Sequence, residues 1–91
     1  FTAPHTPFQA PKEYVDRFNS IADPNRRTYA AMINAMDEQI GAVLAELSRK
    51  GMRGDTLVIF HSDNGGVTSA AFAGQIETKG QLPARNTPLR N

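Results

Sequence analysis

The sequence contains no cysteine and no tryptophan, and it carries almost no net charge. Without cysteine there can be no disulfide, no thiolate metal site and no thiol nucleophile. A formal charge of +1 over 91 residues gives no general reason to expect nucleic acid or an anionic membrane as a partner. No apolar run is long enough to span a bilayer, and no signal peptide is recognisable. The length allows one small domain and not two.

Residues 1–11, FTAPHTPFQAP, contain three prolines. Proline fixes its own φ and disfavours helix at the residue before it, so this stretch is predicted to be an extended or turning loop. His5 lies within it. A lone histidine between prolines can be a surface or packing residue as well as a catalytic one, and the pattern leaves both interpretations open. A short helix is predicted next, over residues 12–19.

A long amphipathic helix is predicted over residues 24–50. Asp23 and Pro24 are typical of an N-cap and a first helical position. Apolar residues then recur at steps of three and four, which places them on one face of a helix. Gly51 follows at the point where a left-handed residue commonly ends a helix. The apolar face is explained by core packing alone.

Residues 56–62, TLVIFHS, are predicted to form a buried strand. The apolar run is continuous rather than alternating, as expected when both faces of a strand are covered. A long helix leading into such a strand is typical of a layered α/β unit with a parallel sheet. Residues 67–91 show no sustained period and are predicted to be mostly loop.

A turn of sequence DNGG, residues 63–66, follows the predicted strand. Ligands of open α/β sheets bind beyond the carboxyl ends of the strands. Asp63 and Asn64 offer hard oxygen atoms that suit Ca²⁺ or Mg²⁺. Gly65 and Gly66 are expected to adopt positive φ and to leave room for a bound group. Asn-Gly is also a strong hairpin signal that needs no ligand, so the pattern supports both a metal-ligand turn and a hairpin.

Four segments in this order resemble the sulfatase family, especially the arylsulfatases, within the alkaline phosphatase-like superfamily: APHTP, RRTYAAMINAMDEQIGAVLAEL, TLVIFHSDNGG and NTPLRN. The resemblance implies a layered α/β/α catalytic domain with a mostly parallel sheet, incomplete in this chain. It also implies hydrolysis of sulfate esters by a formylglycine nucleophile. Asp63 and Asn64 match the family's calcium ligands, and His5 matches the histidine of its HxP segment, which contacts the sulfate group or the leaving oxygen.

The chain departs from the family pattern in several places. It lacks the C/S-x-P-x-R segment from which formylglycine is made, and the adjacent aspartates of the family's first strand. It ends before the lysine that follows NTPLR in the family, and Lys79, upstream of NTPLR, does not replace that lysine. Calcium takes about six to eight oxygens, whereas Asp63 and Asn64 supply at most about three. We therefore expect the chain to be a fragment of a sulfatase catalytic domain, with a partial calcium site and no activity alone.

Two alternatives remain at this point. Another hydrolase of the superfamily, such as a phosphonate monoester hydrolase or a phosphodiesterase, would differ in its metal and nucleophile, both outside this chain. A non-catalytic α/β module that self-associates as a homo-oligomer is an alternative of another class, because a strand buried on both faces needs neighbours. The sequence does not identify the substrate or the compartment, although sulfatases of this family are often periplasmic, secreted or lysosomal.

Overall fold

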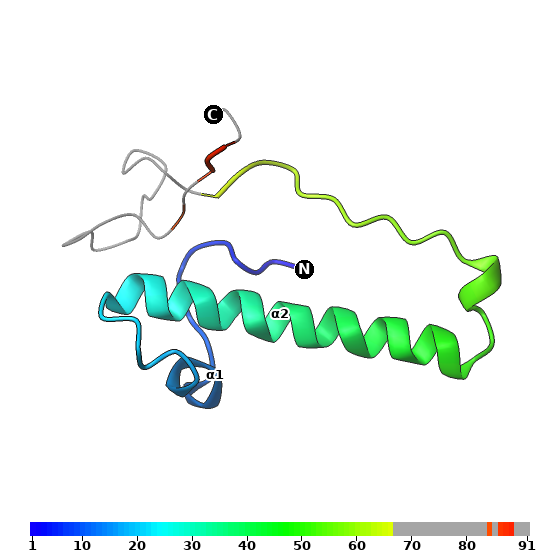
Figure 1. Cartoon of the computed structure of the whole chain (residues 1–91), viewed down its shortest axis with the longest axis horizontal. Coiled ribbons are helices and arrows are strands. Elements are labelled where there is room, and N and C mark those ends of the chain that lie inside the picture. The colour runs from blue at the N-terminus through cyan, green and yellow to red at the C-terminus, as the bar shows by residue number, and fades with distance from the viewer. Residues whose placement is uncertain (67–83, 85, 89–91) are drawn as a thin grey trace.

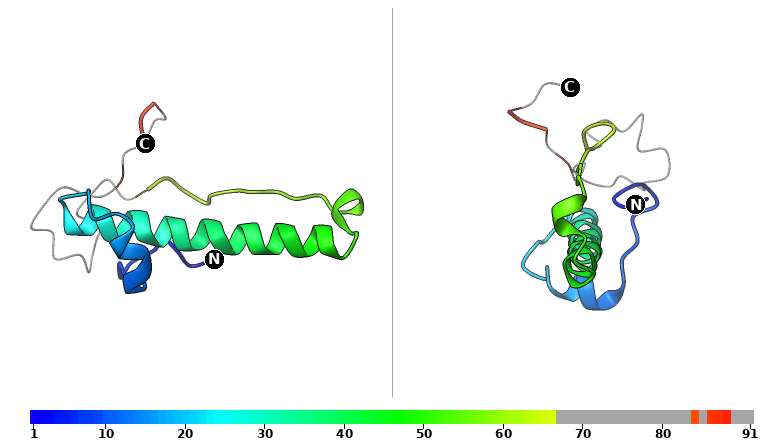
Figure 2. Two further views of the ribbon diagram at one scale, coloured as in Figure 1. Left: turned by 60° about the horizontal axis from the view of Figure 1, so that its bottom comes forward. Right: turned by 90° about the vertical axis from the view of Figure 1, so that its right-hand side faces the viewer.

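The computed structural model of the chain describes residues 1–66, 84 and 86–88 (Figure 1). Its elements are helix α1 (Lys12–Asp16), helix α2 (Pro24–Arg49) and a short 3₁₀ helix, η1 (Arg53–Asp55). The N-terminal loop and α1 wrap around the first half of α2, as Figures 1 and 2 both show. Helix α2 is therefore the scaffold that positions the other described segments.

Helix α2 has well-formed caps at both ends. The Asp23 side chain accepts a hydrogen bond of 2.7 Å from the backbone N–H of Arg26. At the other end Gly51 has φ 69°, and its N–H bonds to the carbonyl of Ser48 while that of Met52 bonds to the carbonyl of Leu47. This pair of bonds is a Schellman motif, which satisfies carbonyls that the helix leaves free. The observed helix, Pro24–Arg49, lies within the range predicted from the sequence, residues 24–50.

A polar cluster on the side of α2 holds α1 in place. The Tyr14 hydroxyl donates a hydrogen bond of 2.7 Å to the Glu38 carboxylate, and the Arg17 guanidinium pairs with the same carboxylate. Arg17 also donates to Asn34 and lies 4.4 Å from the centre of the Tyr14 ring. Helix α1 ends at Asp16, earlier than the predicted helix over 12–19, because the chain turns at Arg17.

Acid is expected to weaken the contact between α1 and α2. The hydrogen bonds from Tyr14 and Arg17 lower the pKa of the Glu38 carboxyl below its ordinary value of 4.5. Because the folded-state pKa is lowered, the contribution of this contact is complete above the ordinary value and is lost as pH falls through the folded-state value. An NMR titration of the Tyr14 ring should therefore show a transition below pH 4.5 that Glu38→Gln removes and Asp55→Asn does not. The same transition in Glu38→Gln would contradict this assignment.

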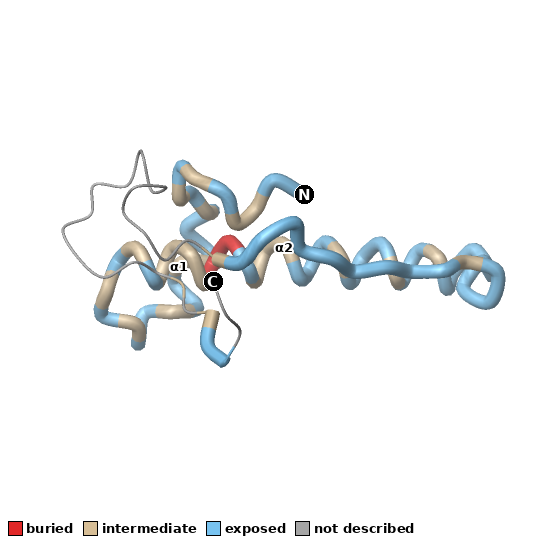
Figure 3. Tube along the Cα trace, turned by 90° about the horizontal axis from the view of Figure 1, so that it is seen from above, coloured by how far each residue is buried: buried red, intermediate tan, exposed pale blue. Residues whose placement is uncertain are grey.

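The predicted buried strand, residues 56–62, is extended but has no strand partner within the described residues. It runs back along α2 toward the start of that helix (Figures 1 and 2). Leu57 is 85% exposed, Ile59 77% and Phe60 75%, so the burial expected from the sequence is not observed (Figure 3). The physical reason is that backbone groups and apolar faces of a strand need neighbouring strands, and none lies in the described part of the chain. The parallel sheet remains a prediction.

The core of the described chain is small and lies near the start of α2. Ala31 and Met32 are its buried residues, with 0% and 6% of their surface exposed (Figure 3). Farther along the helix the apolar face is open, with Val43 55% exposed. Within the described residues, no helix combines the length and the apolar character needed to cross a membrane. Among the described residues, the best-packed part is therefore the end of α2 that faces the N-terminal loop.

Candidate functional site

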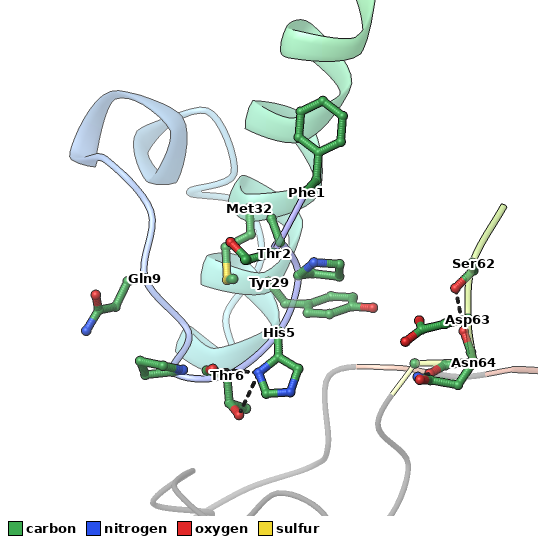
Figure 4. Close-up of a pocket in the computed structure, with 15 residues that line it drawn as sticks. Phe1, Thr2, His5, Thr6, Gln9, Tyr29, Met32, Ser62, Asp63 and Asn64 are labelled. Carbon is green, nitrogen blue, oxygen red and sulfur yellow. Dashed lines mark hydrogen bonds between the residues drawn. The ribbon is translucent and has the colours of Figure 1, made fainter. Parts of the chain in front are cut away.

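One cavity of about 740 Å³ lies between the N-terminal loop, the start of α2 and residues 62–66 (Figure 4). His5 lines it from the loop, Tyr29 and Met32 from the helix, and Asp63 and Asn64 from the turn. All three site residues predicted from the sequence thus line the same cavity. They come from opposite ends of residues 1–66 and line one cavity because the extended segment returns along α2 (Figure 1).

The ring of His5 is held by the backbone next to it. Its Nδ1 atom lies 2.7 Å from the carbonyl oxygen of Thr6. Because a carbonyl only accepts, Nδ1 carries the hydrogen in this contact, and the other nitrogen, Nε2, is left for a bound group. The side chain is exposed, so Nε2 is accessible to a ligand in the cavity.

The oxygens of Asp63 and Asn64 are the donors for a cation. The Asn64 amide nitrogen donates to the carbonyl of Gly65 at 2.8 Å, and the Ser62 hydroxyl donates to the carbonyl of Asn64. Within the described residues, nothing donates to the Asp63 carboxylate or to Oδ1 of Asn64. These oxygens therefore fit calcium in kind.

The donors do not fit calcium in number. In the part of the chain that the structure describes, no group of three or more His, Cys, Asp or Glu side chains is arranged to hold a metal ion. Ca²⁺ takes about six to eight oxygens, so Asp63 and Asn64 supply only part of a coordination shell. The remaining ligands of such a site would have to come from elsewhere.

The two glycines of the turn let other parts of the chain approach their backbone closely, and neither adopts a positive φ. Among the described residues only Gly51 has a positive φ, so the expectation for Gly65 and Gly66 is wrong. A Cβ atom on Gly66 would lie 2.4 Å from Cβ of Ala84, and one on Gly65 would lie 2.9 Å from the side-chain nitrogen of Asn86. The space beside the glycines is thus occupied by the chain itself. The hairpin alternative depends on residues 67–83, which lie outside the residues that the structure describes.

Asn86 bonds to both backbone groups of Gly66. Its Oδ1 atom accepts from the Gly66 N–H at 2.9 Å, and its Nδ2 atom donates to the Gly66 carbonyl at 3.0 Å. Asn86 was assigned no role from the sequence beyond its place in the NTPLRN segment. No periodic pattern of the sequence connects two positions twenty residues apart, so this contact could not be predicted from the sequence.

Tyr29, on α2, is a second residue whose place at the cavity was not predicted from the sequence. Its ring packs against Phe8 edge to face, with ring centres 5.6 Å apart and planes at 61°. Its hydroxyl points toward the turn (Figure 4), where a Cβ on Gly66 would lie 3.1 Å from it. The Phe8 contact thus fixes a hydroxyl at the wall of the cavity.

Comparisons with known proteins match nearly the whole chain. The model of the family described as Sulfatase matches residues 1–89. Arylsulfatase J of Mus musculus is 43% identical over 70 residues, which are 77% of this chain and 12% of that protein. The uncharacterized sulfatase YdeN of Escherichia coli strain K12 is 32% identical over 69 residues, 74% of this chain and 12% of that protein. An arylsulfatase of Klebsiella aerogenes is 28% identical over 119 aligned positions, 79% of this chain and 26% of that protein.

The matched region is a small part of each relative. The chain spans between 12% and 26% of the length of these curated proteins. No solved structure gave a significant match.

Proposed function

Because the chain belongs to the sulfatase family, we propose that it forms part of the catalytic centre of a calcium-dependent sulfatase that hydrolyses sulfate esters. The observation that carries this proposal is that His5, Asp63 and Asn64 line one cavity. Two of the relatives are named arylsulfatases, which supports a sulfate ester as the substrate class. The family membership favours this function over a phosphonate monoester hydrolase or a phosphodiesterase.

In this proposal Asp63 and Asn64 would hold calcium through their side-chain oxygens. The ion, when bound, supplies positive charge beside the sulfate oxygens, the role of a Lewis acid. The hydrogen bond from Asn64 to Gly65 directs the amide nitrogen to the backbone and leaves Oδ1 for a cation. The unbonded Asp63 carboxylate provides the negative charge of the turn.

His5 would hold or protonate the leaving oxygen of the ester. In the protonated ring both nitrogens carry hydrogen, so Nε2 can give its proton to the departing alcohol or phenol while Nδ1 keeps its bond to Thr6. The nucleophile of this proposal is a formylglycine from a C/S-x-P-x-R segment, which the 91 residues do not contain. The chain alone is accordingly inactive in this proposal.

The same proposal assigns the segments of the chain. Residues 1–11 are the loop that carries the histidine, residues 56–62 become a strand of the parallel sheet, and residues 63–66 present the metal ligands. The exposed apolar side chains from Leu57 to Phe60 support this assignment, since they leave a strand-length surface for neighbouring strands of the catalytic domain. Sheet neighbours would then cover the apolar run.

The test is an assay of the complete gene product that carries these residues. We expect it to hydrolyse 4-nitrophenyl sulfate, to lose this activity on chelation and to regain it with added calcium. The purified 91-residue chain, assayed in parallel, should show none. Turnover of a phosphodiester or phosphonate monoester without turnover of the sulfate would contradict the proposal, as would sulfate turnover by the isolated chain.

A further inference from the structure

We propose that Asn86 is a positioning residue that holds the turn of residues 63–66 in the form that binds the cation. The inference rests on the proposed function, because it concerns the same cation site. Asn86 does not line the cavity itself. It acts through the backbone of Gly66, two positions after the ligand Asn64.

The contact between Asn86 and Gly66 reproduces the pairing of two peptide groups. A side-chain amide has one carbonyl and one NH₂ group, and here each bonds to the complementary group of a single residue, at 2.9 Å and 3.0 Å. Both Gly66 groups are partly buried, so leaving them without partners would cost free energy. The Asn86 side chain thus does for the end of the extended segment what a neighbouring strand would otherwise do.

The absence of side chains at the two glycines is what permits this contact. A Cβ on Gly65 would lie 2.9 Å from Nδ2 of Asn86 and 3.0 Å from its Cγ and Oδ1 atoms. The amide therefore lies directly against the Gly65 backbone. A larger residue at position 65 would push the amide away and break both bonds to Gly66.

The bonds continue from Gly66 to the ligand residues. The Gly65 carbonyl belongs to the same peptide group as the Gly66 N–H that Asn86 holds, and it accepts the hydrogen bond from the Asn64 side chain. The Asn64 carbonyl in turn accepts from the Ser62 hydroxyl. Three consecutive peptide groups, those with the carbonyls of Asn64, Gly65 and Gly66, thereby carry side-chain hydrogen bonds, and Asp63 lies in the chain between Ser62 and Asn64. Fixing Gly66 therefore restricts the directions that the Asp63 and Asn64 oxygens can take.

Residues that orient metal ligands without touching the metal typically change its affinity by about 10–100-fold when they are replaced. We expect Asn86→Ala in the complete gene product to weaken calcium binding by about this factor, measured by titration calorimetry. Turnover of 4-nitrophenyl sulfate should recover when calcium is raised to saturation, because Asn86 touches neither the substrate nor the ion. Asn86→Asp keeps the acceptor for the Gly66 N–H and loses the donor to the Gly66 carbonyl. Its calcium affinity should therefore lie between that of the parent and that of Asn86→Ala.

A second readout does not require calcium. In the calcium-free protein, the Gly66 amide hydrogen should exchange with solvent faster in Asn86→Ala than in the parent, measured by NMR. Asn19→Ala removes an exposed asparagine side chain and should change neither the exchange nor the affinity. If Asn86→Ala does not fold, Asn86→Asp carries both measurements.

The outcomes separate this inference from the proposed function. Calcium binding and Gly66 exchange that are the same in the parent, Asn86→Ala and Asn86→Asp would overturn the role of Asn86 while leaving the sulfatase proposal intact. A parent protein that neither binds calcium nor hydrolyses the sulfate ester would overturn the proposed function and, with it, the role of Asn86 in cation binding. A loss of turnover that saturating calcium does not restore would also contradict a positioning role.

Discussion

Replacing Asp63 with alanine is expected to lower the calcium affinity of the complete gene product by at least about 100-fold. Residues that only orient metal ligands change the affinity by up to about 100-fold, and the loss of a ligand itself should cost at least as much. Asp63 is the only carboxylate among the described residues that line the cavity. Its removal takes away the negative charge of the turn and up to two oxygen donors. Hydrolysis of 4-nitrophenyl sulfate at micromolar calcium should fall below detection.

Two further variants make this result specific. Asp63→Asn keeps one oxygen donor but not the charge, so its calcium affinity should lie between those of the parent and Asp63→Ala. Asp55→Ala removes an exposed carboxylate outside the cavity and should bind calcium like the parent. The helical circular dichroism should be the same in all of them, because Asp63 makes no hydrogen bond within the described residues. Calcium affinity unchanged by Asp63→Ala would remove the turn from the cation site.

Replacing Gly66 with alanine is expected to destabilise the chain around the cavity by about 1–3 kcal/mol, the usual cost of overpacking. The new Cβ would lie 2.4 Å from Cβ of Ala84 and 3.1 Å from the Tyr29 hydroxyl, so the backbone must move. That movement should also break the bonds to Asn86 and lower calcium affinity. Chemical denaturation and calcium titration of the same variant measure both effects.

The double variant Gly66→Ala with Ala84→Gly tests the clash directly. Deleting the Ala84 methyl group removes the shorter of the two contacts, so the double variant should be more stable than Gly66→Ala alone, and the two changes should be non-additive. Gly54→Ala is the matched control, since a Cβ there would have no neighbour within 4 Å in the described residues. Equal stability of Gly66→Ala and Gly54→Ala would show that no close approach exists at position 66.

The long helix was predictable because its signals are local. Asp23, Pro24 and Gly51 act within one turn of the helix ends, and the apolar spacing between them has the period of a helix. The family was recognisable for a different reason, since segments in a fixed order carry information that no single motif holds. The grouping of His5 with Asp63 and Asn64 followed from that resemblance and not from any spacing rule.

What could not be predicted depends on contacts between distant parts of the chain. A strand such as residues 56–62 is buried only where other strands lie beside it, and hydrophobicity does not say whether they belong to the same 91 residues. Glycine allows either an unusual φ or a close approach, and the sequence does not distinguish these uses. At Gly65 and Gly66 the partner is Asn86 or Ala84, both far along the chain.

The Schellman turn at Gly51 and the 3₁₀ helix η1 reverse the direction of the chain. The length of α2 and the length of the returning segment, residues 56–66, therefore decide together where that segment ends. Helix α2 has 26 residues and, at about 1.5 Å per residue, is about 39 Å long. Residues 56–66, extended at about 3.3 Å per residue, return over about 36 Å. Figure 1 shows the result, since the returning segment ends beside the start of the helix. The length of the helix therefore sets the distance between His5 and the turn of residues 63–66. Each residue inserted into α2 would move the turn about 1.5 Å away from His5, so the geometry of the cavity depends on the number of residues in the helix as well as on the side chains that line it.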